Sequence, residues 1–328
     1  MRRLTIWLAV IFATLSLGMA ACKQTTNTID VYAPDGAPAL ALGLLMSEDT
    51  AEDNVEYHVV SSATIQTYVT GNQPKADVCV LPVNLAAKLL GDGSSYKMAG
   101  VVTHGNMYMI AKEANSYTRE NASALIGKTV GVVQLANVPG LTLKMALSSL
   151  EIPYNDLSNG AEERVDAVNL KPVDVKSLLG ADLYLLPSPA ADKRVENAGF
   201  SFVGSLQELY GGDRGYPQAV VVVKNELLND GSEWVRGFVE KLALGDEWLK
   251  TTNQSLVAGT VAKYIEEGLT PTFTAENLTQ SAIAHSGVWF QAMDNAAVEE
   301  VEQFLTRMVA IDDQKASVPN KQFYWNAL

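Results

Sequence analysis

The sequence has few of the residues that reaction centres need. Its 328 residues include two cysteines and three histidines, and none of these stand at a spacing typical of metal ligands. The Gly-x-Ser-x-Gly turn and the Gly-x-x-x-x-Gly-Lys-Ser/Thr phosphate loop are both missing. Acidic pairs such as Glu162-Glu163 and Glu299-Glu300 stand in polar or helical surroundings, where solvated side chains are the rule. The sequence therefore offers no positive case for an enzyme, a metal or a cofactor.

Positive charge is also scarce. Lysine and arginine together number 24 against 37 acidic residues, so the formal net charge is −13. An acidic surface repels nucleic acid, which argues against nucleic acid as a partner. Such a surface suits a body held near an anionic membrane without lying flat against it.

The most apolar stretch of the chain lies at its beginning. Residues 4–17 are almost wholly apolar, follow Met1-Arg2-Arg3 and precede the run GMAAC at 18–22. A basic, an apolar and a small-residue part in this order are typical of a secretory signal. The apolar part is shorter than the roughly 20 residues that span a bilayer. We therefore expect residues 1–21 to be a signal peptide that is removed before Cys22.

Cys22 is the expected site of attachment of the mature chain to the membrane. The run at 18–22 resembles a bacterial lipobox, in which the cysteine is lipidated and becomes the new N-terminus, although Met19 stands where leucine is usual. A chance cysteine after an ordinary signal peptide is the alternative. With Cys22 lipidated, residues 22–28 form a polar tether and no disulfide to Cys79 can form, so the fold depends on its core. Cys79 lies in an apolar run, and we expect a buried thiol there.

Short apolar runs alternate with helical patterns along the rest of the chain. This rhythm restarts near Lys128 and predicts an α/β fold with parallel strands and crossover helices. The length of the chain favours two lobes, and the last third is expected to be mostly helical. The run at 219–223 is apolar throughout, which predicts a strand buried on both faces. Strands are expected at residues 29–32, 57–60, 78–81, 129–133, 183–186 and 219–223.

Small and polar residues follow several of these strands where they end. In open α/β sheets, ligands bind at the carboxyl ends of strands, where helices begin and present unpaired N–H groups. Helix capping explains any single one of these residues, but their coincidence at the same end of two sheets predicts a binding cleft. The candidate ligand-binding residues are Asp35, Gly36, Ala37, Ser61, Ser62, Thr64, Pro82, Asn84, His104, Asn106, Gln134, Asn137 and Ser188.

Five motifs in a fixed order resemble those of one family. They are APDGAPA at 33–39, ADVCVLPVNLA at 76–86, LIGKTVGV at 125–132, ADLYLLPSP at 181–189 and KQFYW at 321–325. Together they resemble a first ligand loop, a DIAxxPxNxA segment, the entry to a second lobe, a D-hydrophobic-hydrophobic-L-P-x-P run and an FYY-like ending. The whole mature chain thus resembles the type II periplasmic solute-binding proteins of ABC importers, in the nitrate, sulfonate and thiamine-precursor group.

This resemblance implies a two-lobed α/β fold of the periplasmic-binding-protein type, with two parallel-rich sheets, flanking helices and a double hinge crossing. Lobe I would comprise residues 29–110 and 219–328, and lobe II residues 111–218, with crossings near 109–112 and 218–220. The chain would be a monomer, lipid-anchored to the cell membrane on its extracytoplasmic side. It would capture a small metabolite between the lobes for an ABC permease, without catalysis.

The sequence leaves open which ligand is bound and whether binding serves import, sensing or catalysis. The strand-end loops contain no lysine or arginine, which favours a neutral or weakly charged, heteroaromatic ligand. Arg214, near the second crossing, is either a surface residue or a ligand contact. Tyr32 and Tyr68 either stack on the ligand or pack in the core. Two other functions fit the same fold, a lipid-anchored ligand sensor and a pyrimidine-precursor synthase-like enzyme, although the cysteine- and histidine-rich motif of that enzyme is missing.

Overall fold

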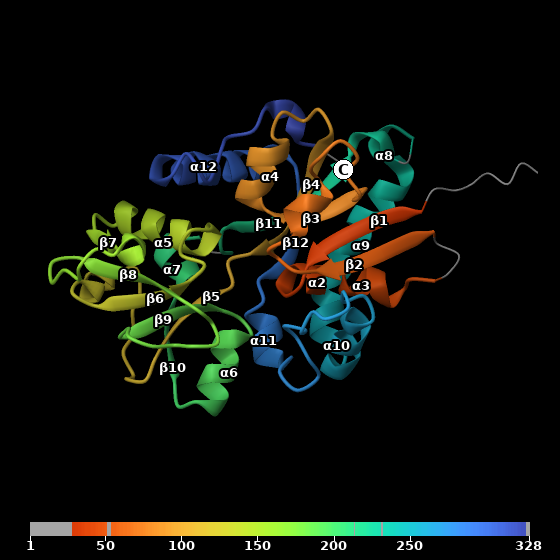
Figure 1. Ribbon diagram of the computed structural model, residues 1–328. Coiled ribbons are helices and arrows are strands. Elements are labelled where there is room, and N and C mark those ends of the chain that lie inside the picture. The colour runs from red at the N-terminus through yellow and green to blue at the C-terminus, as the bar shows by residue number, and fades with distance from the viewer. Residues whose placement is uncertain (1–27, 51–53, 213, 231, 326–328) are drawn as a thin grey trace, which may run out of the picture.

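The computed structural model describes residues 28–50, 54–212, 214–230 and 232–325, and these form two lobes with a six-stranded sheet in each (Figure 1). The signal peptide, Cys22 and most of the tether lie outside the described residues. The first sheet contains β1 (Ile29–Pro34), β2 (Val55–Val60), β3 (Val78–Pro82), β4 (Tyr96–His104), β11 (Pro217–Lys224) and β12 (Val288–Ala292). The second contains β5 (Met107–Ala111), β6 (Thr129–Val133), β7 (Tyr154–Asp156), β8 (Val168–Val173), β9 (Leu183–Pro187) and β10 (Ser201–Ser205).

Both sheets are mixed. Their strand orders are β12-β4-β11-β3-β1-β2 and β10-β5-β9-β6-β8-β7. In the first sheet β1 runs parallel to β2 and β3, whereas β11 runs antiparallel to both of its neighbours. In the second sheet β6 runs parallel to β8 and β9, and β5 and β10 add antiparallel pairs. Each sheet is thus a parallel group of strands extended by antiparallel ones.

The strands expected from the sequence are confirmed, and others were missed. All six expected runs are strands, and residues 219–223 of β11 are at most 3% exposed, as expected for a strand buried on both faces. The missed strand β12 lies in the third expected to be mostly helical. It forms an edge of the first sheet by pairing with β4, so a distant partner rather than a local pattern decides its conformation.

Helices cover both faces of the first sheet, and α5, α6 and α7 belong to the second lobe (Figure 1). The helices are α2 (Ala37–Ala41), α3 (Gly43–Ser47), α4 (Val83–Leu90), α5 (Val138–Ser149), α6 (Ala190–Asn197), α7 (Leu206–Tyr210), α8 (Asn225–Asp230), α9 (Ser232–Thr251), α10 (Gln254–Ala262), α11 (Gln280–Ala284) and α12 (Asn295–Ile311). The described residues also form four short 3-10 helices, η1 (Ile65–Tyr68), η2 (Ala122–Leu125), η3 (Leu157–Asn159) and η4 (Lys321–Phe323). Within the described part of the chain, none of the helices combines the length and the apolar character that crossing a bilayer requires.

Alternating side chains of the central strands build two separate cores. Val221 and Val223 face the core under α2, α3, α9 and α10, whereas Val220 and Val222 face the core that α4 and α12 share with the second lobe. Cys79 belongs to the shared core and is fully buried, as the sequence predicts. Burial raises the pKa of its thiol far above the ordinary value.

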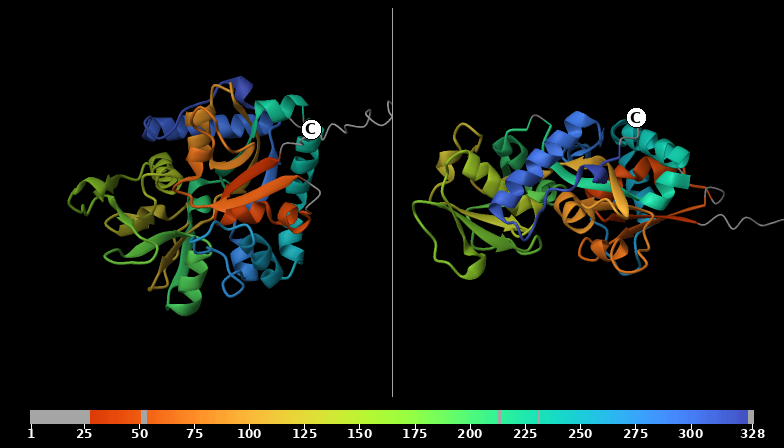
Figure 2. Two further views of the ribbon diagram at one scale, coloured as in Figure 1. Left: turned by 45° about the vertical axis from the view of Figure 1, so that its right-hand side comes forward. Right: turned by 90° about the horizontal axis from the view of Figure 1, so that it is seen from above.

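The chain changes sheets twice (Figure 2). It leaves the first sheet after β4 through Gly105 and Asn106 and enters β5, and it returns between α7 and β11. The expected lobe boundaries at 110 and 219 therefore fall a few residues after the points where the chain changes sheets. Pairing of β5 with β9 is the cause, because it places residues 107–110 in the second sheet.

Gly140 allows the turn after β6 to close onto the start of α5. A Cβ atom at this position would lie 1.9 Å from the carbonyl oxygen of Leu135, and a backbone atom cannot swing aside. We expect Gly140→Ala to lower the free energy of unfolding by about 1–3 kcal/mol, as over-packing does, in urea denaturation. Gly237→Ala in α9 is the control, because its Cβ would meet nothing within 4 Å and should stabilise the chain by about 0.5–1 kcal/mol. Equal changes in the free energy of unfolding for Gly140→Ala and Gly237→Ala would contradict the conclusion that the turn before α5 has no room for a Cβ atom.

Candidate functional site

A cavity of about 620 Å³ lies between the strand ends of the two lobes. The first lobe contributes the ends of β1, β3 and β4 and the turn after β2, and the second lobe contributes the turn from β6 to α5. This is the location that the sequence predicts for a cleft, because parallel strands bring their carboxyl ends to one edge. Six of the candidate residues line the cavity, namely Asp35, Ser62, Pro82, Asn84, Gln134 and Asn137.

The other candidates lie outside the cavity lining. Gly36 and Ala37 are buried next to Asp35, at the start of α2. Ser61 and Thr64 hold their own turn, since the Thr64 hydroxyl donates to the Ser61 carbonyl oxygen at 3.1 Å. The remaining three candidates are buried around the crossings between the sheets, and they are His104, Asn106 and Ser188.

Three polar side-chain atoms of the cavity wall lack hydrogen-bond partners. Asn84 Oδ1, Thr103 Oγ1 and Gln218 Oε1 are buried and make no hydrogen bond among the described residues. The Asn84 side-chain amide donates to the Lys315 carbonyl oxygen at 2.9 Å, so its oxygen is held in place. A buried polar group without a partner costs about 1–3 kcal/mol, which a ligand recovers when it supplies the missing partner.

Thr103 and Gln218 were missed by the sequence reasoning. Antiparallel β11 begins where its neighbours end, and Ala219 pairs with both Pro82 and Thr103. The start of one strand therefore joins the ends of two others at the cavity. A polar residue directly before the apolar run at 219–223 is the signal that marks Gln218 in the sequence. Thr103 stands in the polar run at 103–106, from which only His104 and Asn106 were chosen as candidates.

Two helices begin at the cavity. The N-cap residues of α4 and α5 are Pro82 and Asn137, and neither side chain caps its helix by a hydrogen bond. Unpaired N–H groups at helix starts carry partial positive charge and donate hydrogen bonds to ligand oxygens. Gln134, in the turn before α5, has a φ of 57° although it is not glycine. Such backbone conformations cost about 1–3 kcal/mol and concentrate at binding sites.

Two lysines also line the cavity. Lys88 comes from within α4, and Lys315 from the segment that follows α12. The Lys88 ammonium donates to the Gln314 carbonyl oxygen, which holds this late segment against α4. Asp35 is the acidic residue of the lining, and its carboxylate accepts from the backbone N–H and the hydroxyl of Thr272 at 2.7 and 2.6 Å. The cavity therefore contains two basic residues although the strand-end loops themselves contain none.

His104 packs between protein groups away from the cavity. Its ring stacks on Trp289 with 3.4 Å between centroids, and its Nε2 lies 3.2 Å from Gln291 Oε1. Burial lowers the pKa of His104 to about 3. Arg214 lies over the same Trp289 ring, 3.6 Å from its centroid, and is absent from the cavity lining. These contacts indicate a structural role for both residues.

Tyr32 and Tyr68 stack on each other, with 4.3 Å between ring centroids, and neither lines the cavity. Of the two alternatives for these rings, the geometry favours packing.

Side chains also join the lobes outside the cavity. Asp192 at the start of α6 is 3% exposed, and its Oδ1 lies 2.7 Å from His285 Nδ1 and accepts from Ser281 Oγ at 3.0 Å. The hydroxyl of Ser188 donates to the Ala282 carbonyl oxygen at 3.2 Å. Burial by itself would raise the pKa of Asp192, but the bonds from His285, Ser188 and Ser281 outweigh burial and hold it below its usual value. Ser188 thus contributes to a contact between the lobes.

Comparison with known proteins finds similarity in structure. No protein-family model matches the chain, and no curated protein matches its sequence. An ABC transporter structure from Parabacteroides distasonis matches with a TM-score of 0.67 at 15% identity, over 92% of this chain and 99% of that one. The periplasmic aliphatic sulphonate binding protein SsuA from Escherichia coli matches with 0.62 at 12% identity, over 91% and 97% of the two chains.

A third similar structure is a cysteine-to-serine mutant of DszB in complex with biphenyl-2-sulfinic acid. It matches with a TM-score of 0.54 at 16% identity, over 90% of this chain and 96% of that one. At such identities the matches show the fold, and they confirm the two-lobed α/β architecture expected from the sequence.

The buried imidazole of His104 should make the fold sensitive to acid. Its pKa of about 3 lies below the ordinary value of about 6.5, so the unfolded chain binds a proton between these values that the folded chain does not. Stability should therefore fall by up to about 1.4 kcal/mol per pH unit as the pH decreases through this window. We expect the free energy of unfolding, measured by urea denaturation from pH 7 to pH 4, to change less with pH in His104→Phe than in the original chain. The same dependence of unfolding free energy on pH in both chains would contradict the conclusion that the buried imidazole of His104 stays neutral.

Proposed function

We propose that the chain is the lipid-anchored, extracytoplasmic solute-binding component of an ABC importer, and that it captures a small molecule between its lobes. The observation that carries this proposal is a single cavity lined by strand ends of both sheets and by three unpaired buried polar atoms. A ligand that contacts both lobes favours their closed arrangement. The fold is shared with an ABC transporter protein and with a sulphonate binding protein, which supports this role.

The cavity favours an organic anion of small size. Two helix starts without side-chain caps and two lysines offer hydrogen-bond donors and positive charge. Leu85, Leu89 and Val138 line the same space and suit an apolar part of the ligand. A volume of about 620 Å³ lies within the range of small-molecule sites. This chemistry replaces the neutral ligand favoured by the strand-end loops alone.

Binding without catalysis is the better interpretation of this cavity. Its lining contains neither histidine nor cysteine among the described residues. Cys79 is fully buried with a raised pKa of its thiol, so it is unsuited to act as a nucleophile. A ligand sensor would use the same cavity, and adjacent permease and ATPase genes would favour import over sensing.

Asn84 provides a test of the cavity. We expect Asn84→Leu to weaken ligand binding by about tenfold or more, because it removes a held polar group that faces the ligand. Isothermal titration of the full chain against aliphatic sulfonates, organic carboxylates and neutral heteroaromatics would identify the binder and measure this loss.

Asn225→Leu is the matched control for that titration. Asn225 also has a buried Oδ1 without a partner among the described residues, and its amide donates to two backbone carbonyl oxygens, those of Gly93 and Ser94. It lies outside the cavity, so its loss should lower the melting temperature and leave affinity unchanged. Equal affinity of the Asn84→Leu variant and the original chain would show that the ligand binds elsewhere.

Lipid attachment at Cys22 has a direct test. In a bacterial host, Cys22→Ala should abolish labelling by radioactive palmitate and move the chain from the membrane fraction to the soluble fraction. The lipid is attached through the sulfur of the cysteine side chain, and alanine offers no sulfur. Cys79→Ala is the control and should keep both label and location, because the Cys79 thiol is buried. Retention of label in Cys22→Ala would place the lipid elsewhere.

A further inference from the structure

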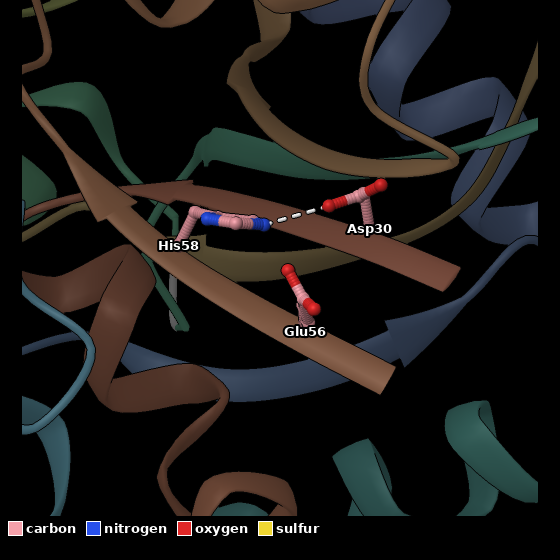
Figure 3. Close-up of side chains that lie close together, drawn as sticks. All are labelled: Asp30, Glu56 and His58. Atoms are coloured by element: carbon pink, nitrogen blue, oxygen red, sulfur yellow. Dashed lines mark hydrogen bonds and ion pairs between the residues drawn. The ribbon is translucent and has the colours of Figure 1, made fainter. Parts of the chain in front are cut away.

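A second group of polar side chains gathers on the β1–β2 edge of the first sheet. Asp30 comes from β1, and Glu56 and His58 come from β2, the last strand in the sheet order (Figure 3). The parallel register places Asp30 beside Glu56 and Tyr32 beside His58. Alternate residues of a strand face the same side, so all of these side chains stand on one face of the sheet.

The three side chains meet at close range. One ligand atom from each lies within 4.8 Å of the other two, and His58 Nε2 lies 2.7 Å from Asp30 Oδ1. Figure 3 shows Glu56 extending toward the gap between the other two side chains. Two atoms that each bind one zinc ion at about 2.1 Å lie roughly 3 Å apart, so small rotations bring these groups onto a shared ion.

Aromatic stacking holds the imidazole in this position. The His58 ring lies parallel to the Tyr32 ring, with 4.2 Å between centroids and 15° between planes, and Tyr32 stacks on Tyr68 behind it. Tyr32 is only 7% exposed and belongs to the core shared by the two lobes, so it gives the imidazole a fixed surface to pack against.

The charges of the cluster are not balanced by the protein. Among the described residues, no lysine or arginine forms an ion pair with Asp30 or Glu56. Two carboxylates at such close range repel each other, and a cation between them removes the repulsion. The side chains of Asp30 and His58 are 33% and 30% exposed, so an ion can reach them from solvent.

We propose that Asp30, Glu56 and His58 bind one divalent transition-metal ion, with water completing its coordination. One imidazole and two carboxylates suit zinc and its neighbours in the first transition row, whereas magnesium prefers oxygen ligands alone. Asp30 precedes the cavity residue Pro34 by four positions, about 13 Å along a strand, so this site is separate from the cavity. The ion joins the edge strand β2 to β1 and stabilises the folded chain.

Zinc itself is the probe for this site. Isothermal titration of the full chain in mild detergent, after chelator treatment, should show one zinc ion bound and no magnesium binding at the same concentrations. Glu56→Gln and His58→Gln should each weaken zinc binding by about tenfold or more, because each removes a direct ligand. Zinc should raise the melting temperature of the original chain and leave that of His58→Gln unchanged.

His285→Gln is the matched control. His285 makes the same 2.7 Å contact with an aspartate, Asp192, but lacks a third ligand, so zinc binding should be retained. The Glu56 side chain makes no hydrogen bond or ion pair among the described residues, so we expect Glu56→Gln to fold and to test the site even where His58→Gln does not fold. Absence of zinc binding to the original chain, or full zinc affinity in Glu56→Gln, would overturn the proposal.

Discussion

The insertion of β11 between β3 and β4 is the interaction on which the rest of the structure depends. This strand comes after the whole second lobe in sequence, and it pairs antiparallel with both neighbours through a run of buried valines. Alternate valines enter opposite cores, so one strand fixes the helices on both faces of the first sheet. Because β11 enters where β3 and β4 end, its first residues complete the wall of the cavity.

The cavity therefore combines segments that are remote in sequence. Asn84 bonds to the backbone of Lys315, and the β6–α5 turn reaches the same space from the other sheet. The protein leaves the amide oxygens of Asn84 and Gln218 and the hydroxyl of Thr103 in this wall without hydrogen-bond partners among the described residues, and a ligand that pairs with them recovers the cost of burying them. The contact of Asp192 with His285 and Ser281 joins the lobes elsewhere through a buried carboxylate. Any change in the arrangement of the lobes would have to keep or break this contact.

The β1–β2 edge shows how two sites can share one strand pair. Pro34 and Asp35, at and after the end of β1, line the cavity, whereas Asp30, near the start of the strand, faces His58 and Glu56. Parallel pairing in register brings the three side chains together without a loop to position them. The stack of Tyr32 between His58 and Tyr68 links this cluster to the shared core, to which Tyr32 belongs.

Local pattern by itself determined the α/β class, the main strands, the buried Cys79 and the strand ends at which Asn84 and Gln134 stand. These features follow from alternation, apolar runs and turn residues, which act over a few neighbouring positions. Tertiary structure alone decided that Gln218, Lys88 and Lys315 reach the cavity, because strand insertion and chain crossings bring them there. It also stacked His104 on Trp289, away from the cavity, and made β12 a strand through its partner β4. Such contacts join residues far apart along the chain, and no local pattern records them.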